Sequence, residues 1–310
     1  MRALCALFPG KLTLLVSHSA PDLLFGGAEF ARIVELEMNF RDADALMYDP
    51  RHAARQLGPQ DLFLSVLPGG VREWAQLAEV LRPRWMVGVA DGFACRIPVR
   101  PALHALERTF VVPRAFDRSL QPAAFAAPLP LPAESVHFVE TLRSRLRGRR
   151  LLIIHGETKP EKQWSPSAWT ALLSRFFAEN PDFAGIEIFR DHSALISGLS
   201  NILSLRGLPL ASAMALVAAA DLVVCTDSLF LHTADLWHTP TVALFGPTEE
   251  RIWGARFNPV YKFVQAASMD TLKVDPVLAA MDNLARYIRQ TRYRPLPLNP
   301  GGHFSLIRWT

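Results

Sequence analysis

Short runs of apolar residues alternate along most of the chain with segments whose apolar residues recur every three or four positions. Runs that are apolar along their whole length are typical of parallel strands covered on both faces by helices. In the first half they predict strands at 12–17, 45–48, 62–67, 85–89 and 109–112, and the helical spacing predicts helices at 28–40 and 71–81. In the second half the predicted strands are 151–154, 185–189, 201–204, 222–225 and 241–245, with helices at 166–178, 211–220 and 228–237. The alternation predicts an α/β fold.

A proline-rich stretch separates the two series of strands and helices. Residues 121–132 contain four prolines, and a predicted helix at 133–146 follows and ends in a basic run from Arg143 to Arg150. We therefore predict two Rossmann-like domains, residues 1–145 and 146–310. We interpret the basic run as a solvated helix end and linker, and the alternative is a peripheral contact with an anionic membrane surface.

Composition and cysteine use narrow the class of protein. Half of the 310 residues are hydrophobic, a fifth are charged, and 33 basic minus 29 acidic residues give a net charge of +4. Cys5, Cys95 and Cys225 are odd in number and lack Cys-x-x-Cys spacing, which argues against a disulfide framework or a zinc site. The apolar N-terminal stretch is too short for a signal peptide, and a proline, a serine and an aspartate interrupt the longest apolar region. We expect a soluble cytoplasmic protein without a nucleic-acid partner.

The strongest local signal follows the predicted strand at 222–225. Asp227 and Ser228 are good N-cap residues for the next helix, whose first N–H groups lack intrahelical partners and carry partial positive charge. Phosphate groups bind at such a junction, outside the carboxyl end of a parallel strand. His232 projects from the same face one turn deeper. The alternative is structural: Asp227 caps the helix and His232 is a partly buried core histidine.

A second polar loop follows the predicted strand at 151–154. It carries Thr158, Lys159 and Lys162, and Ser165-Pro166 then opens a helix, because proline suits the first helical turn. A hydroxyl and two lysines at the carboxyl end of a strand could hold a diphosphate by charge and hydrogen bonds. The alternative is an exposed loop with ordinary surface lysines.

Three motifs occur in a characteristic order over residues 150–255. They are the loop with Lys162-x-Trp, the segment Asp227-Ser-x-x-x-His, and the run Pro-Thr-Val-Ala-Leu-Phe-Gly-Pro-Thr that ends at Thr248. In this order they resemble glycosyltransferase family 9, which includes the ADP-heptose:lipopolysaccharide heptosyltransferases. The resemblance implies the α/β GT-B fold, with two Rossmann-like domains whose parallel sheets face a central cleft. It also implies that the C-terminal domain binds the sugar donor.

The resemblance implies a donor-binding set in the second domain. Lys162 matches the lysine that contacts the donor diphosphate, and Leu229 stands where the family has a glycine, which brings a side chain near the phosphates. The full set is Thr158, Lys162, Asp227, Ser228, Leu229, His232 and Thr248.

The N-terminal half offers a candidate catalytic base. Family members carry an aspartate after the first strand, and Asp22 is its natural counterpart here; His18 is the rival because its unperturbed pKa suits a base better. Neither a metal nor a cofactor is expected, because Lys162 and the start of the helix at 228–237 would neutralise the leaving diphosphate.

The resemblance implies an inverting, metal-independent transfer of a sugar to an acceptor hydroxyl in cell-surface glycan synthesis. The donor is a nucleotide-diphosphate sugar, ADP-heptose by analogy. Two alternatives remain open: a non-catalytic nucleotide-binding protein that retains the fold, and a GT-B nucleotide-sugar epimerase. The expected location is the cytoplasm, with the inner face of the membrane as a further site of contact.

Overall fold

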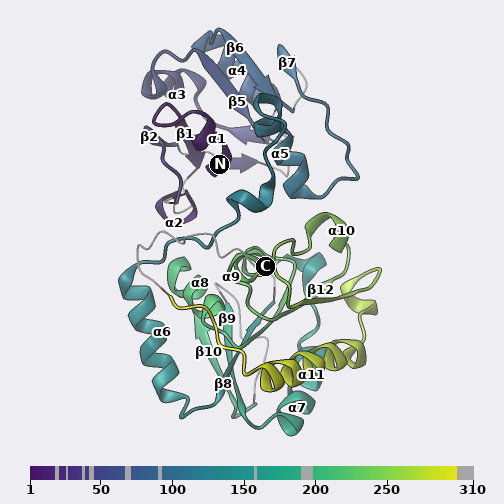
Figure 1. Ribbon diagram of the computed structural model, residues 1–310. Helices are drawn as coiled ribbons and strands as arrows, with labels where there is room; N and C mark the ends of the chain where they lie inside the picture. Colours follow the sequence, from purple (N-terminus) through teal and green to yellow (C-terminus); the bar gives the residue numbers. More distant parts are fainter. Residues whose placement is uncertain are drawn as a thin grey trace. The chain divides into compact units, whose positions relative to one another are not determined.

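The computed structural model describes residues 1–17, 21–25, 27–36, 39–41, 45–66, 71–89, 93–156, 159–189 and 198–298. The chain forms two compact units, Met1–Phe125 and Ala126–Thr310. This division falls before the predicted domain boundary at residues 145 and 146. The reason is that helix α6 (Ala133–Arg145) packs along α8 (Leu210–Ala218) and so belongs to the second unit (Figure 1).

The second unit is built on one sheet of six parallel strands. The strands are β8 (Arg150–His155), β9 (Phe183–Phe189), β10 (Ile202–Arg206), β11 (Leu222–Thr226), β12 (Thr241–Phe245) and β13 (Tyr261–Gln265). They lie in the order β10-β9-β8-β11-β12-β13. The chain therefore moves outward from β8 to one edge and then returns to build the other half from β11. In such a doubly wound sheet, ligands bind outside the carboxyl ends of the strands at the point of reversal, here between β8 and β11.

The first five of these strands confirm the sequence prediction, and for the central strands β8 and β11 burial explains the signal. Leu151, Ile154, Leu222 and Cys225 are all fully buried, because helices cover both faces of the sheet. The sixth strand, β13, was not predicted. It is an edge strand with exposed Lys262 and other half-exposed residues, so it lacks the continuous apolar run of its neighbours.

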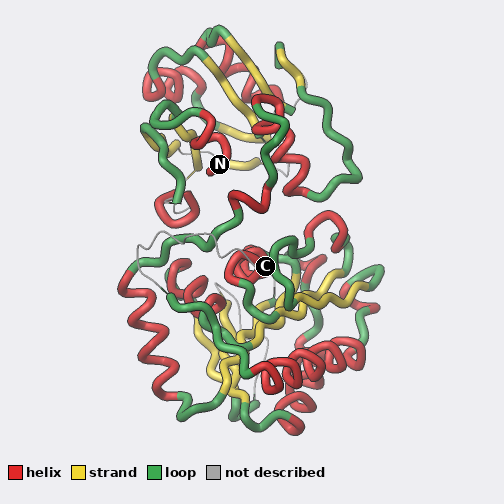
Figure 2. Tube along the Cα trace, in the orientation of Figure 1, coloured by secondary structure: helices red, strands yellow, loops and turns green. Residues whose placement is uncertain are grey.

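Helices pack on both faces of this sheet (Figures 1 and 2). On one face α6, α8 and α9 (Leu229–Trp237) pack against one another, and on the other α7 (Pro166–Glu179) packs on α11 (Val274–Thr291). Ser165 caps α7 as predicted, because its hydroxyl accepts the Ala168 N–H at 3.2 Å. The remaining short elements are η2 (Pro160–Lys162), α10 (Glu250–Trp253) and η3 (Met269–Thr271).

The first unit contains smaller parallel sheets. The pair β1-β2 and the trio β5-β6-β7 are parallel, whereas β3 and β4 pair antiparallel. The strands are β1 (Thr13–Ser17), β2 (Arg32–Leu36), β3 (Asn39–Arg41), β4 (Ala45–Met47), β5 (Leu62–Ser65), β6 (Trp85–Gly88) and β7 (Cys95–Arg96). The helices are α1 (Arg2–Leu7), α2 (Pro21–Phe25), α3 (Pro50–Leu57), α4 (Val71–Leu81), α5 (Ala105–Phe116) and η1 (Pro122–Phe125).

Two predictions in this unit are wrong. The segment predicted as a helix at 28–40 forms β2 and β3, because Ile33 and Val34 pair with Leu14 and Leu15 of β1. The β-branched run predicted as a strand at 109–112 lies inside α5. The imidazole of His104 accepts the Leu106 N–H at 3.1 Å and starts that helix, so the cap outweighs the local strand propensity.

The basic run between α6 and β8 has two parts. Arg143 and Arg150 are only partly exposed and pair with Asp221, at 3.3 and 4.0 Å. Arg145, Arg147 and Arg149 are exposed. The run is therefore not a uniformly solvated linker, because its two ends are tied to the sheet. No helix in the described part of the chain is both long and apolar enough to cross a bilayer.

Candidate functional site

The candidate site lies where β8 and β11 end, at the point where the sheet reverses its order. The ammonium of Lys162, in η2 after β8, donates to the carboxylate of Asp227, just after β11, at 2.8 Å. A longer contact of 3.4 Å joins it to the Asp227 carbonyl oxygen. The lysine side chain is 19% exposed and that of the aspartate 7%. Two residues 65 positions apart in sequence are thus brought together, as the predicted diphosphate site requires.

Trp164 holds the lysine loop in place. Its side chain is buried, and its indole N–H donates to the carbonyl oxygen of Leu272 at 3.2 Å. The ring also packs edge-on against Trp169 of α7, with centroids 5.2 Å apart. Because Trp164 is two residues after Lys162, this anchor limits where the lysine can lie. The Lys-x-Trp pattern therefore combines a charge with the side chain that positions it.

Helix α9 begins without a side-chain cap. Ser228 occupies the N-cap position, but its hydroxyl makes no capping bond and is buried without a partner among the described residues. The Asp227 carboxylate, the other predicted cap, binds Lys162 instead. The first N–H groups of a helix, here those of Leu229 and Phe230, have no intrahelical acceptor. A buried hydroxyl, unpaired N–H groups and the positive end of a helix dipole therefore converge beside Lys162, which suits an anionic ligand.

His232 lies on α9 one turn after Ser228 and is partly buried. Burial lowers its pKa, while the charges of Asp227 and Asp235 act in the opposite direction. The imidazole is therefore neutral near pH 7 and available as a hydrogen-bonding group rather than as a cation.

Asp235, at the other end of α9, has a structural role that the sequence did not reveal. Its carboxylate accepts the backbone N–H groups of Arg256, Phe257 and Asn258 at 2.9, 2.7 and 2.8 Å. It therefore holds the segment that follows α10. A lone acidic residue inside a helical pattern offers no sequence signal for such a role.

The Phe-Gly-Pro-Thr turn after β12 is held from two sides. A Cβ at Gly246 would lie 2.7 Å from the backbone nitrogen of Met269, so only glycine allows this approach. Gln265 donates to the Thr248 carbonyl oxygen at 3.3 Å and accepts the Glu250 N–H at 3.1 Å. Thr248 is partly buried at the carboxyl end of β12, and among the described residues no hydrogen bond joins it to Lys162 or Asp227.

His155, the last residue of β8, contacts both strand β9 and helix α9. Its Nδ1 lies 3.0 Å from the carbonyl oxygen of Ile188 in β9, so this nitrogen carries the proton. Its ring packs edge-on against Phe230 of α9, with centroids 4.6 Å apart. The contact ties the uncapped end of α9 to the sheet. The available sequence signal for this role is the position of His155 as the last residue of a buried strand.

The remaining candidates are only partly covered by the structure. Asp22 lies in α2, and its side chain is outside the described part. His18 and Thr158 also lie outside the described residues. No cluster of three or more His, Cys, Asp or Glu side chains suited to a metal occurs among the described residues.

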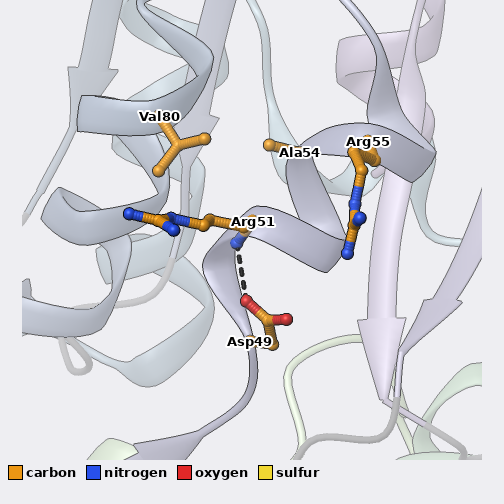
Figure 3. A pocket seen from close by; sticks show the side chains of 5 residues that line it. All are labelled: Asp49, Arg51, Ala54, Arg55 and Val80. Atoms are coloured by element: carbon orange, nitrogen blue, oxygen red, sulfur yellow. Dashed lines mark hydrogen bonds between the residues drawn. The ribbon is translucent and has the colours of Figure 1, made fainter.

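A shallow pocket in the first unit is lined by Asp49, Arg51, Ala54, Arg55 and Val80 (Figure 3). The Asp49 carboxylate accepts the Arg51 N–H at 2.9 Å and caps α3. Its acidic group is therefore already used in the helix, and the pocket offers no set of groups comparable to that around Lys162.

Sequence comparisons agree with the geometry of the second unit. A family model described as glycosyltransferase family 9 (heptosyltransferase) matches residues 95–275, more than half of the chain. A lipopolysaccharide heptosyltransferase 1 from Pseudomonas aeruginosa is 31% identical over 167 residues, which cover 51% of this chain and 44% of that protein. The chain thus covers less than half of the length of this curated relative.

Solved structures share the fold at low sequence identity. A glycosyl transferase family 9 protein from Veillonella parvula has a TM-score of 0.72 at 13% identity, covering 89% of this chain and 88% of its own. The E. coli heptosyltransferase WaaC, solved with ADP, has a TM-score of 0.67 at 17% identity, covering 91% of this chain and 94% of its own. These likenesses show the predicted GT-B type of α/β fold.

Proposed function

Since the chain belongs to glycosyltransferase family 9, we propose that it transfers a sugar from a nucleotide-diphosphate donor to an acceptor hydroxyl. The relatives are heptosyltransferases, and one was solved with ADP. By this likeness the donor is ADP-heptose and the product is part of a cell-surface lipopolysaccharide.

The observation that carries the proposal is the uncapped start of α9 beside Lys162. The Ser228 hydroxyl has no partner among the described residues, and the first N–H groups of a helix have no intrahelical acceptor. Such groups are costly to bury unless a ligand pairs with them. Diphosphate oxygens would pair with them, and the Lys162 ammonium would supply the counter-charge.

The proposed reaction is the one that the likeness to the family implies. The bond between the anomeric carbon and the β-phosphate oxygen breaks, and its electron pair leaves with the nucleoside diphosphate. The acceptor oxygen attacks the opposite face of that carbon, so the configuration inverts, and its proton passes to the Asp22 carboxylate. Lys162 and the positive end of α9 stabilise the charge that develops on the leaving phosphate. These protein groups provide that stabilisation without a divalent metal.

The proposed location is the cytoplasm, at the inner face of the membrane. Arg145 at the end of α6 and Arg147 and Arg149 before β8 are exposed, while Arg143 and Arg150 on either side are tied to Asp221. Each exposed arginine near an anionic bilayer contributes about 1 kcal/mol to binding. Cosedimentation with phosphatidylglycerol vesicles tests this contact. Replacing the three exposed arginines by alanine should lower the bound fraction, and unchanged binding would exclude it.

Calorimetric titration with ADP tests the donor site. Lys162→Met should weaken ADP binding about 10- to 100-fold, because a charge-assisted hydrogen bond is lost. Lys162→Arg should retain most of it, and Lys262→Met, a change at an exposed lysine of β13, should have no effect. Thermal unfolding of each variant shows whether it is folded. Equal ADP affinity in wild type and Lys162→Met would refute the donor site.

Release of ADP from ADP-heptose, with and without a lipopolysaccharide-core acceptor, tests the reaction. Asp22→Ala should keep ADP binding and lose acceptor-dependent release. ADP binding without turnover in the wild type would favour the non-catalytic alternative. Conversion of the donor sugar in the absence of acceptor would identify an epimerase.

A further inference from the structure

Leu229 is an exception in the buried segment around the end of β11. The residues from Leu222 to Ser228 are all buried, and Leu231 is fully buried, but Leu229 is 41% exposed. A large apolar side chain therefore remains in contact with solvent at the first position of α9.

The backbone of Leu229 is fixed, so its side chain projects from a defined place. The Thr233 hydroxyl donates to the Leu229 carbonyl oxygen at 3.1 Å. In an α-helix each Cα–Cβ bond tilts toward the N-terminus. The leucine side chain consequently leans toward the space beyond the start of α9. This is the same space onto which the first N–H groups open, next to the Ser228 hydroxyl, which has no partner among the residues that the structure describes.

From this position we infer that Leu229 is a specificity-determining residue. Its side chain contacts the donor sugar close to the phosphate group that carries this sugar. The inference rests on the proposed function. A leucine side chain offers no hydrogen bond, so a sugar hydroxyl turned toward it would lose water without gaining a partner. A face of C–H groups or a deoxy carbon would instead cover the apolar surface. The site therefore selects nucleotide sugars that turn such a face toward the start of α9.

Binding of two probes, ADP and ADP-heptose, to matched variants tests the assignment by calorimetry. Leu229→Asn keeps a similar size but makes the side chain polar, and Leu229→Met keeps it apolar. Leu203→Asn makes the same change at a leucine of the edge strand β10 that is 50% exposed. We expect Leu229→Asn to weaken ADP-heptose about five- to tenfold while ADP changes less than about twofold. Leu203→Asn should bind both probes like the wild type, and Leu229→Met should weaken ADP-heptose less than Leu229→Asn does.

Two results with Leu229→Asn would overturn the inference about Leu229 and leave the proposed function standing. Either the affinity for ADP-heptose is unchanged, or the affinities for ADP and ADP-heptose fall by the same factor. The second result would mean that the residue acts only through the phosphate site. Failure of the proposed function is distinguishable, because the wild type would then bind neither probe, or would bind them without releasing ADP from ADP-heptose when the acceptor is present. Thermal unfolding midpoints confirm that each variant is folded.

Discussion

Asp221 should be among the residues on which the stability of the second unit depends most strongly. It directly precedes β11, is 4% exposed, and accepts the backbone N–H of Leu151 at 2.8 Å. Arg143 and Arg150 approach the same carboxylate at 3.3 and 4.0 Å. Asp221→Ala removes one acceptor from a buried backbone donor and the counter-charge from two arginines.

The size of the effect follows from the exposure of each partner. Leaving the buried Leu151 N–H without an acceptor costs about 1–3 kcal/mol. The arginine side chains are 35% and 27% exposed, so water replaces part of each pairing, and each adds only about 0.5 kcal/mol. Asp221→Ala should therefore lower the free energy of unfolding by about 2–4 kcal/mol. Asp221→Asn keeps an oxygen acceptor for Leu151 and should cost about 1 kcal/mol.

Urea unfolding followed by tryptophan fluorescence measures these differences, and the chain provides a matched control. Asp275 pairs with Arg175 at 2.6 Å, a shorter distance than in either Asp221 pair, but the two side chains are 80% and 52% exposed. Asp275→Ala should cost less than about 1 kcal/mol, including the loss of an acidic group in the first turn of α11. If Asp275→Ala were as costly as Asp221→Ala, or if Asp221→Asn were as costly as the alanine variant, the burial argument would be refuted.

Three further predictions concern individual side chains. Gly246→Ala should lower the free energy of unfolding by about 1–3 kcal/mol in the same urea assay, because its Cβ would meet the Met269 backbone; an unchanged midpoint would contradict the close approach. Burial lowers the pKa of His232 against two nearby aspartates, so the unfolded chain binds its proton more readily. Stability should fall as the pH drops below the unfolded value of about 6.5, and His232→Gln should lose less between pH 7.5 and 5.5 than the wild type. Cys95 is exposed whereas burial raises the pKa of the Cys225 thiol; mass spectrometry after brief alkylation of the native protein should find Cys95 modified and Cys225 intact.

The second unit could be predicted well because its signals are local. The strand ending at Cys225 is apolar on both faces, and the polar residues after it mark the junction with α9. The Lys162 loop follows its own strand in the same way. Parallel strands place both junctions at one edge of the sheet, so their proximity follows from the pattern.

The predictions failed where partners outside the predicted segment determine its local structure. The run at 109–112 has strand propensity, but the cap from His104 and the burial of Val112 place it in a helix. The assignment of Asp227 as a possible helix cap was wrong for a related reason. A cap is inferred from neighbours in sequence, whereas its actual partner, Lys162, is brought near only by the crossover through β9 and β10.

The two aspartates that flank β11 show how one strand serves both stability and binding. Asp221, before the strand, is satisfied by Leu151 and two arginines. Asp227, after the strand, holds Lys162, and the Ser228 hydroxyl at the start of α9 has no partner within the described part of the chain. Unsatisfied groups persist in native proteins mainly where function requires them. The two ends should therefore respond separately: Asp221→Asn should change the urea midpoint and leave ADP affinity intact, whereas Lys162→Met should lower ADP affinity more than stability. A parallel loss of both properties in either variant would show that the two ends of β11 are not independent.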